Sequence, residues 1–479
     1  MPATVTPPAE NDVVNSGPVK LVNGTSHVTN GHHTTISNGI SHSTTSKPFS
    51  PSNSKVRNET LKALYSSSVV AKIWGVAMRE LDKHCTYYES SVNSSQESPP
   101  TEYPEYTQPQ GVSYITSPHT FWTSGFFPGS LYLLRARLQH HPSHFPSLSP
   151  HPLKLQHAAR WWTANLHSQA SRTDTHDLGF MIKPWAQLGW ELDRDVQCFD
   201  TLVTAAHALA SRFDERVGCV RSWDTCFTKR YAFGDPAEDF LVIIDNMMNL
   251  DLLYYVADLT HNPRLATIAT NHAFTTMKAH IRDDNSTCHV VNFEQSDGSI
   301  KERITNQGLS DESCWSRGQA WGITGFAQAY RWTKERQFLD AACRLADYFL
   351  ERLSDDGVPY WDFDAPIPGP RDSSAGLIAA YGMLLLHQAE SGEGRYLDAA
   401  LRIVEATIKM SLAPEARFVK TSRGDEAVDL GGLETIVGNA TINNYEFAPR
   451  RWADHGLIYA DYYFLLVGNE LLKMGVVWQ

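Results

Sequence analysis

Apolar residues recur at positions i, i+3, i+4 and i+7 in many windows between about residue 56 and the end of the chain, which is the spacing of amphipathic helices. The pattern predicts twelve helices. They lie near residues 57–83, 127–139, 152–169, 181–193, 196–212, 243–259, 262–281, 317–332, 335–353, 374–390, 394–410 and 456–472. Strand signals are few, and short extended pieces such as His289 to Phe293 are expected to form hairpins within loops.

The predicted connections alternate between long and short. Long loops are expected near 84–126, 213–242, 282–316, 354–373 and 411–455, whereas most of the other connections have two to four residues. Such alternation pairs consecutive helices as antiparallel hairpins with all long loops at one end. Twelve helices in six hairpins predict an all-α (α/α)6 barrel, with an open solenoid of hairpins as the alternative. The N-termini of the even-numbered helices then share one rim.

Residues 1–55 differ from the rest in composition. They are rich in Ser, Thr, Asn, Gly, His and Pro and carry few large apolar side chains. Such a segment cannot bury enough apolar surface to offset the entropy of ordering, so a disordered tail is predicted there. Residues 56–479 are expected to form one catalytic barrel domain.

Composition excludes several classes of function. The formal net charge is −12, so the basic surface that binds nucleic acid is absent. The chain has neither a long apolar span nor the pattern of a signal peptide at its start, so no membrane partner and a cytoplasmic location are expected. Its 7 cysteines are scattered without a CxxC pair. Metal-binding and nucleotide-binding motifs are also missing, so neither a metal nor another cofactor is expected.

Polar motifs rich in Trp precede or open the even-numbered helices. They are HTFWTSGFFPGSLYLL with Trp122, HDLGFMIKPW with Asp177, SWD with Trp223, IIDNMMNL with Asp245, TNQGLSDESCWSRGQAW with Gln307, Arg317 and Trp321, and YWDFDAPIPGPRDSSA with Asp372. Taken singly, Asp177 and Asp372 are more simply read as helix N-caps, and Trp on a helix is more often core. Because these motifs share one predicted rim, together they favour a sugar-binding cleft of flat aromatic rings and hydrogen-bonding groups.

Asp245 stands out because it follows two isoleucines and precedes two methionines. Poor solvation raises the pKa of a carboxylate, and a second carboxylate nearby raises the pKa of one of the two. Asp177, which opens the adjacent even-numbered helix, is the expected partner. Two carboxyls with separated pKa values would supply an acid and a base. An N-cap or a buried structural carboxylate remains the alternative for Asp245. Arg317 and His289 are expected to add positive charge, so an anionic sugar is compatible with the acidic chain.

Seven blocks in order resemble the unsaturated glucuronyl hydrolases (glycoside hydrolase family 88). They are WTSGFFPG, HDLGF, IIDNMMNL, GSIKERITNQG, RGQAWGITGFAQAYR, VPYWDFDAP and PRDSSA, and the likeness extends from about residue 56 to the C-terminus. The resemblance implies an (α/α)6 barrel and an unusual hydrolysis of oligosaccharides that a polysaccharide lyase has left with a 4,5-unsaturated uronic acid at the non-reducing end. The C4=C5 enol ether is hydrated, and the glycosidic bond then falls apart.

The resemblance also implies roles for particular residues. Asp245 matches the proton donor and water activator, and Asp177 matches its essential partner carboxylate. Three polar residues, His289, Gln307 and Arg317, match contacts to the unsaturated uronate. Three aromatic residues, Trp122, Trp223 and Trp321, match positions around the sugar ring. This chain departs from the family pattern at Ser124, where Asp is expected in many relatives, and through the inserted segment KRYAFGDPAEDF after Trp223.

Other functions remain open from the sequence. The related unsaturated rhamnogalacturonyl hydrolases share the fold, although the RGQAW and PRDSSA blocks favour the glucuronyl branch. A non-catalytic carbohydrate-binding barrel would not need both Asp177 and Asp245. A sugar epimerase would be expected to rely on rim histidines, of which only His176 and His289 can be placed. The sequence does not identify the sugar that follows the unsaturated uronate, nor its linkage or sulfation, nor the oligomeric state or the role of the tail.

Overall fold

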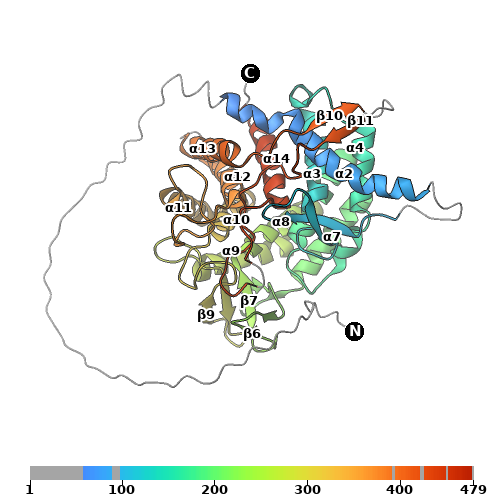
Figure 1. Cartoon of the computed structure of the whole chain (residues 1–479). Helices are drawn as coiled ribbons and strands as arrows, with labels where there is room; N and C mark the ends of the chain where they lie inside the picture. Colours follow the sequence, from blue (N-terminus) through green and yellow to red (C-terminus); the bar gives the residue numbers. More distant parts are fainter. Residues whose placement is uncertain (1–57, 89–97, 391–393, 421–425, 449–450, 477–479) are drawn as a thin grey trace, which may run out of the picture. The chain divides into compact units, whose positions relative to one another are not determined.

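The computed structural model describes residues 58–88, 98–390, 394–420, 426–448 and 451–476 (Figure 1). All of these residues lie in the unit Ser50–Gln479. The predicted disordered tail, residues 1–55, lies outside the described part of the chain. Among the described residues, no helix combines the length and the apolar character that crossing a membrane requires.

Two rings of helices form the barrel. The inner helices are α3 (Phe126–His140), α6 (Lys183–Asp193), α8 (Leu250–Thr260), α10 (Ser316–Thr333), α12 (Ser373–Ala389) and α14 (Ile458–Lys473). The outer helices are α2 (Ser67–Tyr88), α4 (Pro152–Thr163), α7 (Val196–Ala210), α9 (Pro263–His280), α11 (Arg336–Arg352) and α13 (Arg395–Ser411). The inner ring closes because α14 packs against both α12 and α3. The predicted (α/α)6 barrel of six helical hairpins is therefore confirmed.

The inner and outer helices differ in how much of their surface is buried, as expected for two layers. Helix α12 is buried on all sides, and small residues such as Gly382 let it approach Thr324 of α10 closely. The outer helix α11 buries only one stripe, which includes Phe338, Leu345 and Phe349. An amphipathic outer ring around a fully buried inner ring follows from these patterns.

Short strands and helical turns occupy the loops. The hairpins are β1 (Glu102–Thr107) with β2 (Tyr114–Pro118), β3 (Phe213–Asp214) with β4 (Cys219–Val220), β5 (Cys226–Phe227) with β6 (Ala232–Phe233), and β10 (Arg417–Lys420) with β11 (Glu426–Asp429). A three-stranded antiparallel sheet has the order β7 (Phe240–Ile243), β8 (Val290–Phe293), β9 (Ile300–Ile304). The short helical pieces are η1 (Lys62–Tyr65), η2 (Pro142–His144), η3 (His167–Ser171), η4 (Ile244–Asn249) and α5 (Leu178–Met181).

Two predicted helices begin differently in the structure. The helix expected over 243–259 starts as strand β7 and the 3-10 turn η4, because the backbone N–H of Ile243 donates to Ser222 Oγ and that of Ile244 donates to the His289 carbonyl. The helix expected over 181–193 is broken at Ile182, just before Pro184, into α5 and α6. The extended piece at His289 forms the expected hairpin with β9, but it also pairs with β7, which was not expected.

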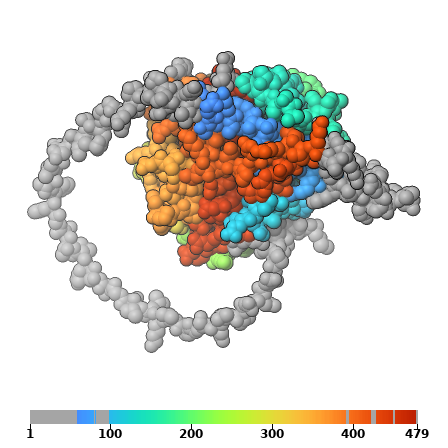
Figure 2. Space-filling model, turned by 45° about the horizontal axis from the view of Figure 1, so that its top comes forward, coloured from blue at the N-terminus to red at the C-terminus, as the bar shows by residue number. Residues whose placement is uncertain are grey.

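The C-terminal part of the chain closes the barrel against its first elements. Figure 2 shows the orange-to-red C-terminal segments beside blue α2 and the cyan β1–β2 region. The buried Lys72 ammonium of α2 donates to the carbonyl oxygens of Leu430 at 3.1 Å and Leu433 at 2.6 Å. The backbone N–H of Tyr114 donates to Glu434 Oε2 at 2.6 Å. These bonds join residues more than 300 positions apart in the sequence.

One close backbone approach fixes the start of α3 against α5. A Cβ atom at Gly125 would lie 2.2 Å from the Phe180 carbonyl oxygen and 2.5 Å from that of Met181. We therefore expect Gly125→Ala to lower the free energy of unfolding by about 1–3 kcal/mol, as overpacking does. Chemical denaturation measures this change.

Gly438→Ala is the matched control, because a Cβ there would have the Ser411 carbonyl oxygen as its nearest neighbour at 3.9 Å. We expect it to stay within about 0.5 kcal/mol of the parent protein. Equal stabilities of the two variants would show that α3 and α5 can separate at no cost.

Candidate active site

Asp245 sits at the junction of strand β7 and helix α8. It is the second residue of η4, whose N-cap is Ile243, so the carboxyl is not a helix N-cap. The neighbouring Asn246 amide donates to the Val220 carbonyl at 2.9 Å and to Ser222 Oγ at 3.3 Å. The turn that carries Asp245 is thus held by buried hydrogen bonds on both sides.

Burial governs the electrostatics of Asp245. Its side chain is 13% exposed, and Oδ2 is a buried atom that has no hydrogen-bond partner in the described part of the chain. Burial raises the pKa of Asp245 to about 7, and the nearby charge of Asp177 acts in the same direction. Arg317 and the Trp321 indole oppose this rise. Near neutral pH the carboxyl is therefore poised between its two protonation states.

His289 faces the same carboxyl. Its Nε2 lies 3.8 Å from Asp245 Oδ2, which is beyond hydrogen-bonding distance. Its Nδ1 accepts the backbone N–H of Asn306 at 3.0 Å, so the ring proton of the neutral form sits on Nε2 and points toward Asp245. Burial, together with the nearby His280 and Arg317, lowers the pKa of His289 to about 3. The expectation that His289 adds positive charge is therefore wrong, because the ring is neutral above that pH.

Asp177 precedes the short helix α5, yet its side chain does not cap it. Instead Oδ2 accepts a hydrogen bond from Thr175 Oγ1 at 3.1 Å, and Oδ1 lies 3.3 Å from His176 Nε2. His176 Nδ1 donates to the Ser222 carbonyl at 2.8 Å. The N-cap interpretation of Asp177 is wrong, and its charge contributes to the raised pKa of Asp245.

Arg317 and Asp372 form a buried ion pair between α10 and α12. Arg317 Nη1 lies 2.5 Å from Asp372 Oδ2 and donates to the Thr441 carbonyl at 2.5 Å, while Nη2 donates to the Ile442 carbonyl at 2.5 Å. Asp372 Oδ1 also accepts the backbone N–H of Ser374 at 3.1 Å, which confirms that Asp372 caps α12. The guanidinium thus acts on Asp245 through its charge, while its hydrogen bonds go to other protein groups.

The three candidate tryptophans occupy different environments. Trp122 is partly buried and packs on Phe180 and Tyr459, with ring centroids 5.5 and 5.3 Å away. Trp223 is half-buried, 6.1 Å from the ring of His289. Trp321 is fully buried, so it is part of the core rather than an open platform, and its indole N–H reaches the surroundings of Asp245.

Gln307 lies in the loop between β9 and α10 and is half-buried. Within the described part of the chain its side-chain amide makes no hydrogen bond, whereas the backbone N–H of the neighbouring Asn306 donates to His289. Gln307 is therefore free to contact a ligand.

Tyr459 belongs to the site but was missed by the sequence analysis. Its ring lies 5.4 Å from the Arg317 guanidinium and packs against Trp122, and its hydroxyl is buried without a hydrogen-bond partner in the described residues. Tyr459 opens α14, the twelfth helix of the barrel. Its place at the start of an inner helix was the signal that could have identified it.

The two departures from the family pattern have different settings. Ser124 is fully buried, and its hydroxyl has no hydrogen-bond partner among the described side chains and backbone. The inserted segment forms the β5–β6 turn and strand β6 and reaches across to the loop before α10. There Arg230 Nη1 and the Tyr231 hydroxyl each lie 3.0 Å from Asp311 Oδ1.

Comparison with proteins of assigned function identifies the family. The chain is 33% identical over 353 residues to an unsaturated glucuronyl hydrolase of Formosa agariphila, covering 73% of this chain and 79% of the relative. The chain belongs to the unsaturated glucuronyl hydrolases. It is therefore a glycoside hydrolase. The chain matches no protein-family model.

Other comparisons agree on the family. An unsaturated glucuronyl hydrolase of Bacillus sp. strain GL1 is 32% identical over 302 residues, which cover 61% of this chain and 75% of that protein. An unsaturated glucuronyl hydrolase specific for heparin has a crystal structure that matches with a TM-score of 0.69 at 28% identity, over 88% of this chain and 99% of that one. The Bacillus structure matches with a TM-score of 0.67 at 27% identity, over 85% and 97% of the two chains.

The described residues contain no group of three or more His, Cys, Asp and Glu side chains that could hold a metal ion. The polar groups around Asp245 are instead a carboxylate, a neutral imidazole and a guanidinium. This set can donate and accept protons and can hold an anionic group close to Arg317.

Arg317→Ala is expected to destabilise the protein by about 3–5 kcal/mol, because it leaves the Asp372 carboxylate buried without its cation. Chemical denaturation at neutral pH measures this. The matched control is Arg336→Ala, which removes an exposed guanidinium 2.8 Å from Asp340 on α11. An exposed pair of this kind contributes little, so the free energy of unfolding of this variant is expected to stay close to that of the parent protein. Equal effects of the two substitutions would contradict a structural role for the Arg317–Asp372 pair.

Proposed function

We propose that this protein releases a 4,5-unsaturated uronic acid from the non-reducing end of lyase-generated oligosaccharides, with Asp245 as the catalytic acid and Asp177 as its partner. The observation that carries the proposal is the free, buried Oδ2 of Asp245, whose carboxyl has its pKa raised to about 7. A carboxyl of this pKa keeps a proton available near neutral pH, which an ordinary exposed Asp does not.

The proposed reaction begins with proton transfer from Asp245 to C4 of the enol ether. The π electrons form the new C4–H bond, and positive charge develops at C5 and the ring oxygen. Asp245, now a carboxylate, takes a proton from a water molecule whose oxygen bonds to C5. The resulting hemiketal opens by breaking the bond between C5 and the ring oxygen. The hemiacetal formed at C1 then expels the aglycone as an alcohol.

The neighbouring groups support this sequence in distinct ways. The charge of Asp177 raises the pKa of Asp245 and would stabilise the positive charge at C5. The Nε2–H of neutral His289 and the Arg317 guanidinium are proposed to lie near the uronate carboxylate, with Gln307 as a further hydrogen-bonding group. Trp122 and Trp223 are proposed to contact the sugar rings, and Trp321 acts through its effect on Asp245.

The direct test is the ultraviolet absorbance of the conjugated enol ether, which hydration abolishes. Unsaturated disaccharides prepared with lyases from chondroitin, hyaluronan, heparin and glucuronan are mixed with the purified protein. We expect loss of absorbance for at least one of them. We expect Asp245→Asn to lower kcat by about 10²–10⁴-fold, which is the contribution of a general acid or base.

Asp258→Asn is the matched control, since it removes an exposed carboxylate from α8, the helix that follows Asp245. It is expected to retain the parent rate. A folded Asp245→Asn variant with the parent rate would remove Asp245 from the proposed role. If the wild-type protein consumed none of the four disaccharides, an unsaturated rhamnogalacturonyl substrate would be the next to test.

The pKa of Asp245 also predicts a pH profile. Because the protonated carboxyl is the reactive form, kcat/KM is expected to fall as the pH rises above about 7. Trp321→Phe removes an indole that lowers this pKa, so the falling limb is expected to move upward by about 0.5–1 pH unit. Rates on one disaccharide across the pH range measure both effects. If the falling limb of the Trp321→Phe variant stayed at the same pH as in the parent protein, the titrating group would be one other than Asp245.

A further inference from the structure

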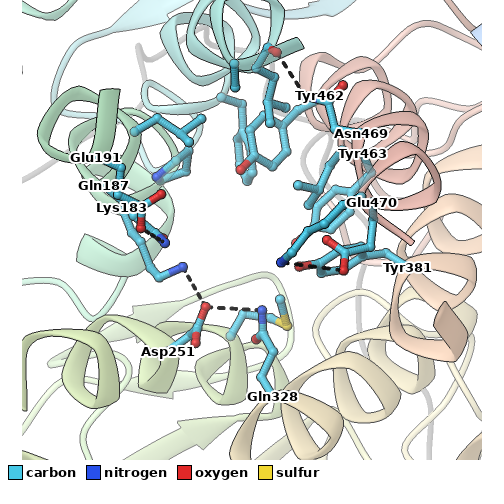
Figure 3. A pocket seen from close by; sticks show the side chains of 18 of the residues that line it. Lys183, Gln187, Glu191, Asp251, Gln328, Tyr381, Tyr462, Tyr463, Asn469 and Glu470 are labelled. Carbon is cyan, nitrogen blue, oxygen red and sulfur yellow. Dashed lines mark hydrogen bonds and ion pairs between the residues drawn. The ribbon is translucent and has the colours of Figure 1, made fainter. Parts of the chain in front are cut away.

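A cavity opens inside the barrel, lined mainly by the C-terminal halves of α3, α6, α10 and α14 and also by Lys183 and Asp251 in the first turns of α6 and α8. Its volume is about 550 Å³, within the range of roughly 300–1,000 Å³ common for small-molecule sites. Figure 3 shows Lys183, Gln187 and Glu191 on one side of this space and Tyr381, Tyr463 and Glu470 on the other. The mechanism proposed above uses none of these residues.

The cavity and the candidate active site lie at opposite ends of the same helices. On α10, Arg317 and Trp321 belong to the active-site end, whereas Gln328 and Arg331 line the cavity. At 1.5 Å per residue, Gln328 and Arg331 lie roughly 16–21 Å from Arg317 along the helix axis. On α14, Tyr459 contacts Arg317, whereas Asn469 lines the cavity.

A layer of aromatic rings separates the two spaces. The centroid of Phe180 lies 5.6 Å from that of Phe126 and 5.2 Å from that of Trp321, and Trp321 lies 5.7 Å from Tyr463. Three rings of this layer line the cavity, namely those of Phe126, Phe180 and Tyr463. Trp321 does not line the cavity, and its indole lowers the pKa of Asp245. A ligand in the cavity would therefore not touch the proposed reacting atoms.

Three tyrosine hydroxyls in the cavity have no hydrogen-bond partner among the described residues. Tyr381, Tyr462 and Tyr463 are 7%, 9% and 3% exposed, and all three line the cavity. Within the described part of the chain their hydroxyls make no hydrogen bond, and none of the three oxygens is fully enclosed by protein. They therefore open onto the cavity itself, where each can donate and accept a hydrogen bond.

The charges around the cavity nearly balance, because four Arg and Lys side chains stand against three Asp and Glu side chains: Arg137, Lys183, Arg331 and Lys473 against Glu191, Asp251 and Glu470. Lys183 Nζ lies 2.6 Å from Asp251 Oδ2, and the Asp251 carboxylate also accepts from Trp332 Nε1 at 2.5 Å. Glu470 Oε1 accepts from Gln388 Nε2 at 2.9 Å and lies 3.9 Å from Lys473 Nζ. The Lys183–Asp251 pair joins the first turns of α6 and α8, while Glu470 and Lys473 lie in the last turn of α14. Because the opposite charges nearly cancel, a ligand of this cavity needs little net charge.

We propose that this cavity binds a neutral saccharide of one or two rings, separately from the hydrolytic site. The aromatic rings of Phe126, Phe180 and Trp332 offer flat apolar faces to the C–H faces of a sugar, and the three free tyrosine hydroxyls match its hydroxyl groups. Amide groups at Gln187 and Gln328 add further hydrogen-bonding positions on the opposite wall.

The test titrates maltose and N-acetylglucosamine into the full-length Asp245→Asn protein, by calorimetry and ligand-observed NMR. Glucuronate and glucosamine serve as charged counterparts. We expect at least one neutral sugar to bind at least tenfold more tightly than the charged counterparts. We expect the double variant Tyr381→Phe/Tyr462→Phe to weaken that binding at least tenfold. Saturating unsaturated chondroitin disaccharide is expected to leave the binding unchanged.

Tyr330→Phe is the matched control, since Tyr330 lies on α10 outside the cavity lining, and it is expected to bind as the parent does. Thermal melting checks the fold of each variant, and the two single Tyr→Phe variants replace the double variant if it unfolds. Absence of neutral-sugar binding, equal binding to the tyrosine variants, displacement by the disaccharide or preference for a charged sugar would each overturn the proposal. The titration reads no turnover, so its failure leaves the proposed function standing.

Discussion

The buried ion pair between Arg317 and Asp372 is the interaction on which the site end of the barrel depends. It joins the N-terminus of α10 to that of α12, and the same guanidinium holds the carbonyl oxygens of Thr441 and Ile442 in the loop that leads to α14. Trp315 and Tyr459 pack on its two sides, 4.6 and 5.4 Å away. Because the charge of this guanidinium also restrains the pKa of Asp245, the fold and the proposed chemistry share one buried cation.

The helices were predictable because the inner ring and the outer ring each have a distinct pattern of apolar residues in the sequence. Outer helices such as α11 alternate an apolar stripe with charge, and inner helices such as α12 are apolar throughout, so both give clear periodic signals. The start of the sixth helix was not predictable, because Ile243 and Ile244 suit a strand as well as a helix. Long-range hydrogen bonds to Ser222 and to the His289 carbonyl decide in favour of the strand, and no local pattern reveals them.

The two carboxylates of the candidate site were predictable from the sequence, whereas the contacts and charge states of its residues were less so. The apolar setting of Asp245 signalled burial, and burial is indeed the main cause of its raised pKa. The neutral state of His289 was not predictable, since it follows from burial and from the charge of Arg317, which only the tertiary structure brings close. Whether an Asp caps its helix also depends on competing hydrogen-bond donors: Asp372 does so, while the Asp177 carboxylate instead accepts a hydrogen bond from Thr175.

The direction of the helices gives the barrel two chemically different ends. At the active-site end the helix N-termini carry partial positive charge, which suits a uronate, and the cation there is placed beside a carboxyl that must keep its proton. In the cavity, Lys183 and Lys473 are already paired with Asp251 and Glu470. The aromatic layer around Phe180 and Trp321 lies between the cavity and Asp245. The proposed hydrolytic site and the proposed saccharide site would then share one helical framework, with different charged groups around each.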